Sequence, residues 1–160
     1  MFDFKPAAGT AKPELYADLL SAAGALTDGE QDGVANMANI AALLWEFLPE
    51  VNWTGFYRVV GEELVLGPFA GRPACIRIAM GAGVCGAAAQ SGQSQLVDDV
   101  HAFPGHIACD ADTRSELVVP VMRGGRVIAV IDLDSPKASR FDVQDREGIE
   151  SLAAMLADRI

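Results

Sequence analysis

Hydrophobic residues recur with a helical period near both ends of the chain. The stripe in 12–26 is Leu15, Leu19, Ala22 and Leu26, and that in 31–48 is Val34, Met37, Ala41, Leu44 and Leu48. A third stripe follows Asp142, a candidate N-cap with Asp145 three residues on; it contains Ile149, Leu152, Ala153, Leu156 and Ile160. Because apolar residues three or four apart share one helix face, the pattern predicts two N-terminal helices and one C-terminal helix.

Between these helices the pattern changes to short apolar runs typical of strands. "WTGFYRVV" and "ELVLGP" flank Gly61-Glu62, and "ELVVPVM" and "RVIAVIDLD" flank Gly124-Gly125, so each pair predicts a β-hairpin. "ACIRI" and "SQLVDDV" are two further predicted strands, and "GVCGAAAQSG" is a short predicted helix bounded by glycine. The order of elements predicts an α+β domain over 1–160, with a mostly antiparallel sheet packed by the terminal helices.

Composition and charge narrow the class of protein. With 160 residues, 51% of them hydrophobic, the chain can bury the core of one domain. A net charge of −10 argues against binding nucleic-acid phosphates or anionic membrane surfaces. The N-terminus lacks the basic and apolar regions of a signal peptide, and no apolar run approaches membrane-spanning length. We therefore expect a cytoplasmic protein, in which thiols stay reduced.

The chain has three cysteines, Cys75, Cys85 and Cys109, and no CxxC pair. In a reducing compartment they are catalytic, metal-binding or incidental rather than structural disulfides. Cys75, in "PACIRI", is equally explained as a small buried hydrophobe, whereas Cys85, in "GAGVCG", is expected near a helix start. Cys109 lies in the loop-like "PGHIACD" beside His106, and a nearby imidazolium or helix N-terminus lowers a thiol pKa and creates a nucleophile.

A zinc site is the competing use of the same loop. His101, His106, Cys109 and Asp110 offer ligand atoms, and Cys75 or Cys85 would complete a tetrahedral set. Structural zinc sites usually contain two closely spaced ligand pairs, and "HIAC" is a single pair. The sequence therefore disfavours a metal site, and both histidines are equally consistent with ordinary loop residues.

Acidic residues stand in two otherwise apolar strands. Asp132 and Asp134 alternate with Ile131 and Leu133, so both carboxylates point to one face. A strict two-residue turn at Gly124-Gly125 would pair Glu116 with Leu133, whereas a three-residue turn or a bulge would pair it with Asp134. Apolar matching of the strands favours the second register. This face is either a solvated surface or, with Cys109 seven residues before Glu116, part of a pocket.

Two aromatic residues in "NWTGFY" also share a strand face. Trp53 and Tyr57 are four residues apart, with Thr54 and Phe56 on the opposite face. Core packing explains such a pair. Alternatively, the pair forms an aromatic wall facing the carboxylates, in a pocket shaped for a small amphiphilic cation.

These motifs together resemble one family. "NWTGFY", "LVLGPFAGRPACIRIAMGAGVCG", "DDVHAFPGHIACDADTRSELVVP" and "VIDLDSP" are similar to segments of the free methionine-(R)-sulfoxide reductases, enzymes built on a single GAF domain. The resemblance extends from about Leu15 to the end of the chain. Residues 1–12 lie outside it, and we expect them to form a loosely ordered N-terminal segment. The resemblance implies helices on one face of the sheet and a ligand pocket on the other.

The resemblance also implies roles for individual residues. Cys109 matches the catalytic cysteine, Cys75 the usual resolving partner, and Cys85 a third thiol able to take part in disulfide exchange. Glu116, Asp132 and Asp134 match carboxylates of the substrate pocket, and Trp53 and Tyr57 its aromatic wall. The implied reaction reduces free methionine-(R)-sulfoxide without a metal or organic cofactor. The resemblance further implies an enzyme that is commonly a homodimer and is recycled by thioredoxin, with a role in oxidative stress.

The residues alone leave two other functional hypotheses open. A GAF domain that binds a small ligand without catalysis would act as a sensor, because one fold supports many functions. We expect no fused output domain in this chain, and an acidic pocket would repel phosphate, which disfavours a cyclic-nucleotide sensor. A zinc-stabilised interaction module is the third reading.

Overall fold

The computed structural model describes residues 5–7, 9–105 and 111–160. Its elements are α1 (Lys12–Leu26), α2 (Gly33–Phe47), β1 (Trp53–Val60), β2 (Glu63–Gly71), β3 (Arg77–Ala79), α3 (Gly83–Ser91), β4 (Gln95–Val97), the 3-10 helix η1 (Val100–Ala102), β5 (Ser115–Arg123), β6 (Arg126–Ser135) and α4 (Val143–Leu156). The predicted helices and hairpins are confirmed. No helix in the described part of the chain is long and apolar enough to span a bilayer.

Two predicted strands are shorter than expected. The "ACIRI" segment enters the sheet only at Arg77, because the carbonyl of Cys75 accepts a hydrogen bond from the Tyr57 hydroxyl instead of joining a strand ladder. The "SQLVDDV" segment leaves the sheet after Val97, where the Asp99 carboxylate accepts a hydrogen bond from the His101 amide and begins η1. The last helix likewise ends at Leu156, before Ile160. In the two strands, a side-chain hydrogen bond thus overrides the apolar pattern: a distant one from Tyr57 and a local one to Asp99.

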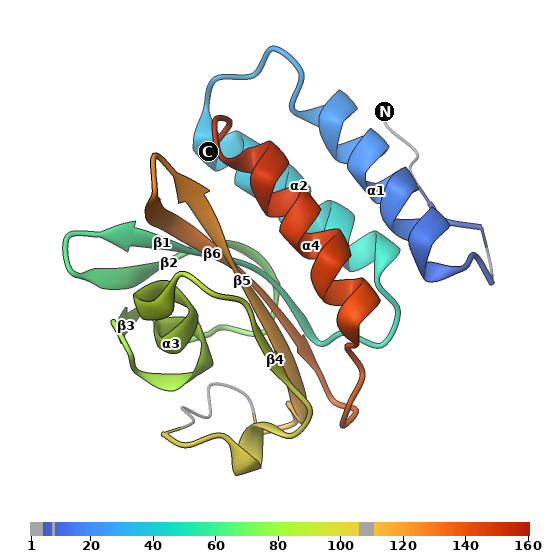
Figure 1. Ribbon diagram of the computed structural model, residues 1–160. Coiled ribbons are helices and arrows are strands. Elements are labelled where there is room, and N and C mark those ends of the chain that lie inside the picture. The colour runs from blue at the N-terminus through green and yellow to red at the C-terminus, as the bar shows by residue number, and fades with distance from the viewer. Residues whose placement is uncertain (1–4, 8, 106–110) are drawn as a thin grey trace.

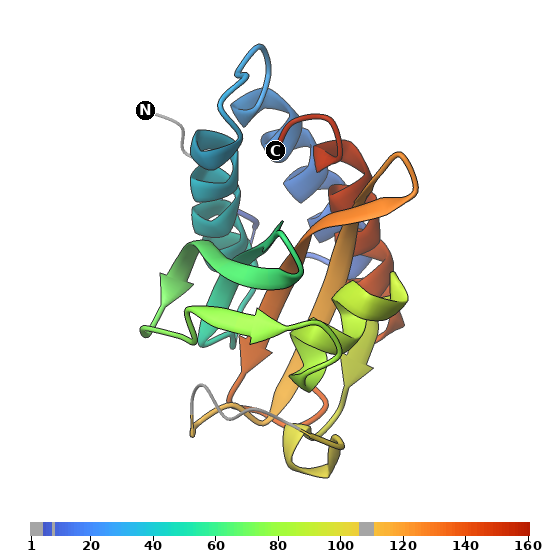
Figure 2. The same cartoon turned by 90° about the vertical axis from the view of Figure 1, so that its left-hand side faces the viewer.

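The described strands form one antiparallel sheet in the order β3-β2-β1-β6-β5-β4. Helices α2 and α4 cover one face with α1 packed on their outer side, and α3 lies against the opposite face (Figures 1 and 2). This is the predicted α+β arrangement, with a mostly antiparallel sheet packed by terminal helices. The family resemblance did not predict that α3 would cover part of the opposite sheet face.

Side chains of the central strands alternate between two cores. Toward α1, α2 and α4 point Phe56, Leu117, Val119, Val121, Ile131 and Leu133. Toward α3 point Trp53, Tyr57, Val118 and Val130. The strand period of two therefore separates a predominantly apolar helix-side core from the sheet face that carries Glu116, Asp132 and Asp134.

A β-bulge sets the register between β5 and β6. Arg123 pairs with Arg126 across the Gly124-Gly125 turn, and the register shifts between Val121 and Met122. Both turn glycines have positive φ, as this tight turn requires. The shift pairs Glu116 with Asp134 and confirms the register that apolar matching favoured.

The packing of α1 on α4 depends on one glycine. A Cβ atom on Gly148 would lie 2.2 Å from Cγ of the Tyr16 ring. The ring is held there because the Tyr16 hydroxyl donates to Asp145 Oδ1 at 2.8 Å and Lys12 binds the same carboxylate. The close approach of these helices therefore requires the absence of a side chain at this position.

We predict that Gly148→Ala destabilises the protein although alanine is the better helix former. A Cβ 2.2 Å from a ring atom is a severe clash, so the overpacking cost lies toward the upper end of about 1–3 kcal/mol and exceeds the gain of about 1 kcal/mol in helix propensity. Gly24→Ala in α1 is the matched control, since the added Cβ would meet no described atom within 4 Å apart from its chain neighbours and the backbone of its own helix. Urea denaturation of both variants measures the effect, and equal or higher stability of Gly148→Ala would contradict the packing.

Candidate active site

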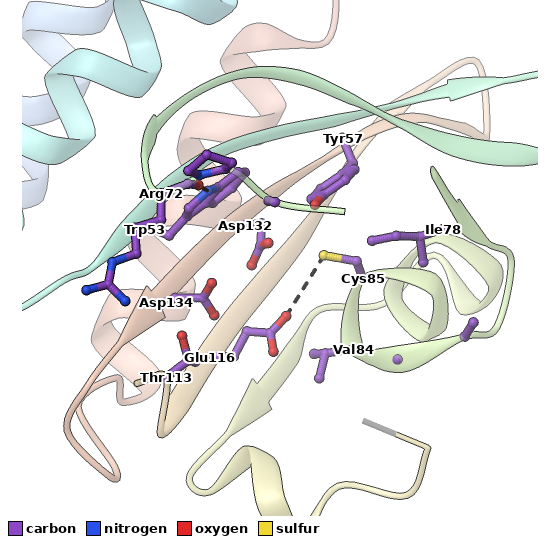
Figure 3. Close-up of a pocket in the computed structure, with 14 residues that line it drawn as sticks. Trp53, Tyr57, Arg72, Ile78, Val84, Cys85, Thr113, Glu116, Asp132 and Asp134 are labelled. Atoms are coloured by element: carbon purple, nitrogen blue, oxygen red, sulfur yellow. Dashed lines mark hydrogen bonds between the residues drawn. The ribbon is translucent and has the colours of Figure 1, made fainter. Parts of the chain in front are cut away.

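A pocket opens on the sheet face that α3 covers. The residues that line it are Trp53, Tyr57, Arg72, Pro73, Ala74, Ile78, Ala82, Gly83, Val84, Cys85, Thr113, Glu116, Asp132 and Asp134 (Figure 3). Its cavity measures about 40 Å³, counted as the space open to the centre of a water molecule. The pocket lies on the face opposite the three long helices, where the family resemblance placed it.

The strand register brings the acidic residues together. Asp134 pairs with Trp53 of β1 on one side and with Glu116 of β5 on the other. Asp132, two residues earlier on β6, points to the same face (Figure 3). Glu116 and Asp132 are only 7% and 5% exposed, so this face is a buried pocket and not a solvated surface.

Burial shifts the protonation of these carboxyl groups. Burial, followed by the charges of Asp132 and Asp134, raises the pKa of Glu116 well above its usual range. Burial also raises the pKa of Asp132 from 3.8 to about 6, although hydrogen bonding from Cys85 and Glu116 offsets part of the rise. Like charges in a low-dielectric site favour the neutral form. The pocket therefore offers a protonated carboxylic acid near neutral pH.

The aromatic pair forms one wall and anchors a loop. Trp53 stacks on Tyr57 with ring centroids 5.9 Å apart. Its indole Nε1 donates to the Arg72 carbonyl at 3.1 Å, and the Tyr57 hydroxyl donates to the Cys75 carbonyl at 3.0 Å. Both side chains are buried and both line the pocket, so the pair packs in the core and also forms a wall of the pocket. The wall also fixes the connection between β2 and β3, which carries Cys75.

Gly55 makes room for this wall, and the sequence reasoning missed it. A Cβ on Gly55 would lie 2.8 Å from Cη2 of Trp53 and 2.4 Å from Cβ of Phe69. Trp53 also stacks on Phe69 at 5.2 Å between ring centroids. A glycine within an aromatic strand is a signal of close approach, and "WTGFY" contains that signal.

Cys85 faces the carboxylates from the first turn of α3. Its Sγ lies 3.9 Å from Glu116 Oε1, and its side chain is buried (Figure 3). The prediction that it lies near a helix start is confirmed. Burial, followed by the charges of Asp132 and Glu116, raises the pKa of this thiol, which outweighs the expected activation by the helix N-terminus. Cys85 is therefore a neutral thiol at the pocket floor.

The remaining predicted residues lie elsewhere or outside the described part. Cys75 is half-buried between β2 and β3. His101 is exposed on η1, with Nδ1 3.0 Å from Asp99 Oδ1. Cys109, His106 and Asp110 lie outside the described residues. Among those described, the grouped metal-type side chains are Cys85, Glu116 and Asp132, a set without His101 or Cys75.

Two further features of the pocket were not found from the sequence. At the mouth, Arg72 Nη1 binds Asp112 Oδ2 at 3.1 Å and so joins the β2–β3 connection to the segment before β5. At the floor, α3 begins after Ala82, which provides no side-chain cap for the helix. The first N–H groups of a helix lack intrahelical partners, so this end of the pocket suits an anionic group.

The fold and the pocket can be compared with known proteins. Residues 25–160 match the model of the GAF domain family, so the protein is a GAF domain. The chain is 48% identical to the free methionine-R-sulfoxide reductase of Escherichia coli, over 91% of this chain and 88% of the relative. It is 41% identical to the Saccharomyces cerevisiae protein of the same name, over 91% of this chain and 85% of the relative.

A solved structure agrees with these relatives. The free methionine-R-sulfoxide reductase of Neisseria meningitidis, in complex with its substrate, is 43% identical and superposes with a TM-score of 0.92, covering 97% of this chain and 93% of that one. The chain belongs to the GAF-domain family of free methionine-R-sulfoxide reductases. The family expectation drawn from the sequence motifs is thereby confirmed.

We predict that Asp132→Asn stabilises the protein at neutral pH. A carboxyl group with a raised folded pKa stabilises the fold while protonated; the stabilisation is full below the unfolded pKa and is lost as pH rises through about 6. The rise of the pKa from 3.8 to about 6 corresponds to on the order of 3 kcal/mol. The advantage of the variant should therefore grow between about pH 4 and pH 7.

Urea denaturation across this pH range measures that advantage. Asp18→Asn, on the exposed surface of α1, is the matched control and should show no comparable growth. An advantage of Asp132→Asn that is constant with pH would show that the carboxyl group does not titrate in this range.

Proposed function

We propose that this protein reduces free methionine-(R)-sulfoxide to methionine. The observation that carries the proposal is the buried Glu116–Asp132 pair, whose raised pKa values provide a proton donor beside an aromatic wall. A sulfoxide oxygen leaves sulfur only when it is protonated, which is the task of such a donor. The relatives from Escherichia coli and Neisseria meningitidis support the same reaction class.

The pocket is complementary to a free amino acid. Its carboxylates can hold the substrate ammonium, with Asp134 beside Trp53 in the sheet as the first candidate. The N-terminus of α3, which also lines the pocket, suits the substrate carboxylate. The methyl group then lies against the Trp53 ring. Such two-ended recognition favours the free amino acid over a methionine within a protein chain, because only the former has both charges.

We assign the chemical step to Cys109 as nucleophile and Glu116 as acid. The thiolate attacks the sulfoxide sulfur and Glu116 protonates the oxygen. The hydroxyl group then passes to the Cys109 sulfur as the bond between the two sulfurs breaks, which releases methionine and leaves Cys109 as sulfenic acid. Glu116 is the preferred donor because its pKa is raised well above the usual range by burial and by the charges of Asp132 and Asp134. No metal or organic cofactor takes part.

Recycling requires a second thiol, and Cys75 is the better candidate. It is half-buried on the connection that Trp53 and Tyr57 anchor, whereas Cys85 is buried and neutral. Condensation of the sulfenic acid with Cys75 releases water and forms a disulfide, which an external dithiol reduces by exchange. Thioredoxin as this reductant, a homodimer, a cytoplasmic location and a role in oxidative stress complete the proposal.

An acidic pocket disfavours the sensor alternative for phosphate ligands. Among the described lining residues the cationic side chain is Arg72, which is mostly exposed and binds Asp112. Three carboxyl groups face the interior (Figure 3). A cyclic nucleotide would place its phosphate against like charges, whereas an ammonium group is attracted.

We predict that the R isomer of free methionine sulfoxide is turned over and that Cys109→Ser lowers kcat at least about 10³-fold, since it removes the attacking sulfur. Consumption of NADPH through thioredoxin reductase and thioredoxin measures turnover for each isomer. Cys75→Ser is the matched control, because it should still release one methionine per chain in a single turnover. No turnover of either isomer would overturn the enzyme assignment, and turnover by Cys109→Ser would overturn the role of Cys109.

A second prediction concerns the disulfide. One equivalent of substrate, added without reductant, should link Cys75 to Cys109 and leave Cys85 as a thiol. Alkylation under denaturing conditions followed by peptide mapping identifies the linked pair. A Cys85–Cys109 peptide as the main product would transfer the resolving role to Cys85.

A further inference from the structure

Cys85, Glu116 and Asp132 form a compact group of ligand atoms at the pocket floor. Cys85 Sγ and one carboxylate oxygen from each acid lie within 4.8 Å of one another. The side chains come from α3, β5 and β6, and all are buried. A tetrahedral zinc ion with bonds of about 2.3 Å to sulfur and 2.0 Å to oxygen separates these ligands by about 3.5 Å. Cys85 Sγ and Glu116 Oε1, 3.9 Å apart, already approach that spacing.

An unsatisfied oxygen in the same group independently points to a cation. Asp132 is only 5% exposed, and its Oδ1 has no hydrogen-bond partner among the described residues, so the interactions of Asp132 with Cys85 and Glu116 leave this oxygen unsatisfied. A buried acceptor without a partner is costly, and a cation in the pocket would satisfy it. Figure 3 shows the Asp132 carboxyl group pointing toward the space between Glu116 and Cys85.

We propose that this group is a binding site for a thiophilic divalent cation of the zinc and cadmium class. A thiolate and two carboxylates suit zinc, whereas calcium and magnesium take sets of oxygen ligands. Cys85 loses its proton to solvent as the metal–sulfur bond forms. Water occupies the fourth position, on the open side of the pocket, as in zinc sites with three protein ligands.

Occupation of this site inhibits the enzyme. The cation takes the negative charges that would hold the substrate ammonium, and it removes Glu116 as proton donor. This consequence rests on the proposed function, whereas binding of the metal does not. The site is therefore an inhibitory one, distinct from a metal required for the reaction.

Cadmium binding to a full-length Cys75→Ser/Cys109→Ser variant tests the site. Cys85 is then the one thiol in the chain, so ultraviolet cadmium–thiolate absorbance reports it alone. We expect one Cd²⁺ per chain and loss of the absorbance when Cys85→Ser is added. Asp132→Asn should weaken cadmium binding at least tenfold, whereas the matched surface variant Asp18→Asn should not. Circular dichroism checks that each variant is folded.

The possible results distinguish a failure of the proposed metal site from a failure of the proposed enzyme function. No cadmium–thiolate absorbance in the folded double variant overturns the site. Equal affinities in the Asp132→Asn and Asp18→Asn backgrounds overturn the role of the carboxylate. Free methionine-(R)-sulfoxide should raise the apparent Kd for cadmium, and binding without competition overturns the inhibitory consequence. Turnover of the metal-free wild-type protein independently decides the proposed function.

Discussion

The register between β5 and β6 is the constraint on which the pocket depends. The bulge between Val121 and Met122 places Leu117 and Val119 on the helix side, opposite Leu133 and Ile131. A slip of one residue would turn every side chain of a strand to the other face. The carboxylate geometry on one face is therefore held by hydrophobic packing on the opposite face. The acidic residues need no attraction for one another, because the helix-side core determines where they lie.

Because packing of the helix-side core holds the carboxyl groups close together, these groups lie in an environment that disfavours their ionisation. Burial raises the pKa values of Glu116 and Asp132, so that ionisation of these groups works against folding. A site of this kind reduces stability in exchange for reactivity, as active sites commonly do. In the proposed function, the protonated acid is useful because it forms where an aromatic wall and a helix N-terminus line the same pocket and would position a substrate.

The sequence contained the local periodicities but not the long-range environments. The helices, the hairpins and the shared face of Asp132 and Asp134 follow from spacing along the chain, and apolar matching was enough to choose the register of Glu116. The short range of β3 was missed because the bond from Tyr57 to the Cys75 carbonyl joins residues far apart in sequence. The same holds for the Arg72–Asp112 pair and for the burial of Cys85, each of which depends on packing between elements.

The environment of each cysteine distinguishes it better than its spacing does. Cys85 and Cys75 are ten residues apart, yet α3 holds one against buried carboxyl groups while the other lies on an anchored connection near the mouth. A thiol is a weak hydrogen-bond donor, so Cys85 can approach Glu116 without fully satisfying it. The group of Cys85, Glu116 and Asp132 consequently retains an unsatisfied buried carboxyl oxygen, which a positive charge would satisfy. In the proposed function an amino-acid ammonium supplies this charge reversibly, and in the proposed metal site a thiophilic ion supplies it with the thiol as an additional ligand. The feature proposed to attract the substrate would therefore also expose the site to inhibition.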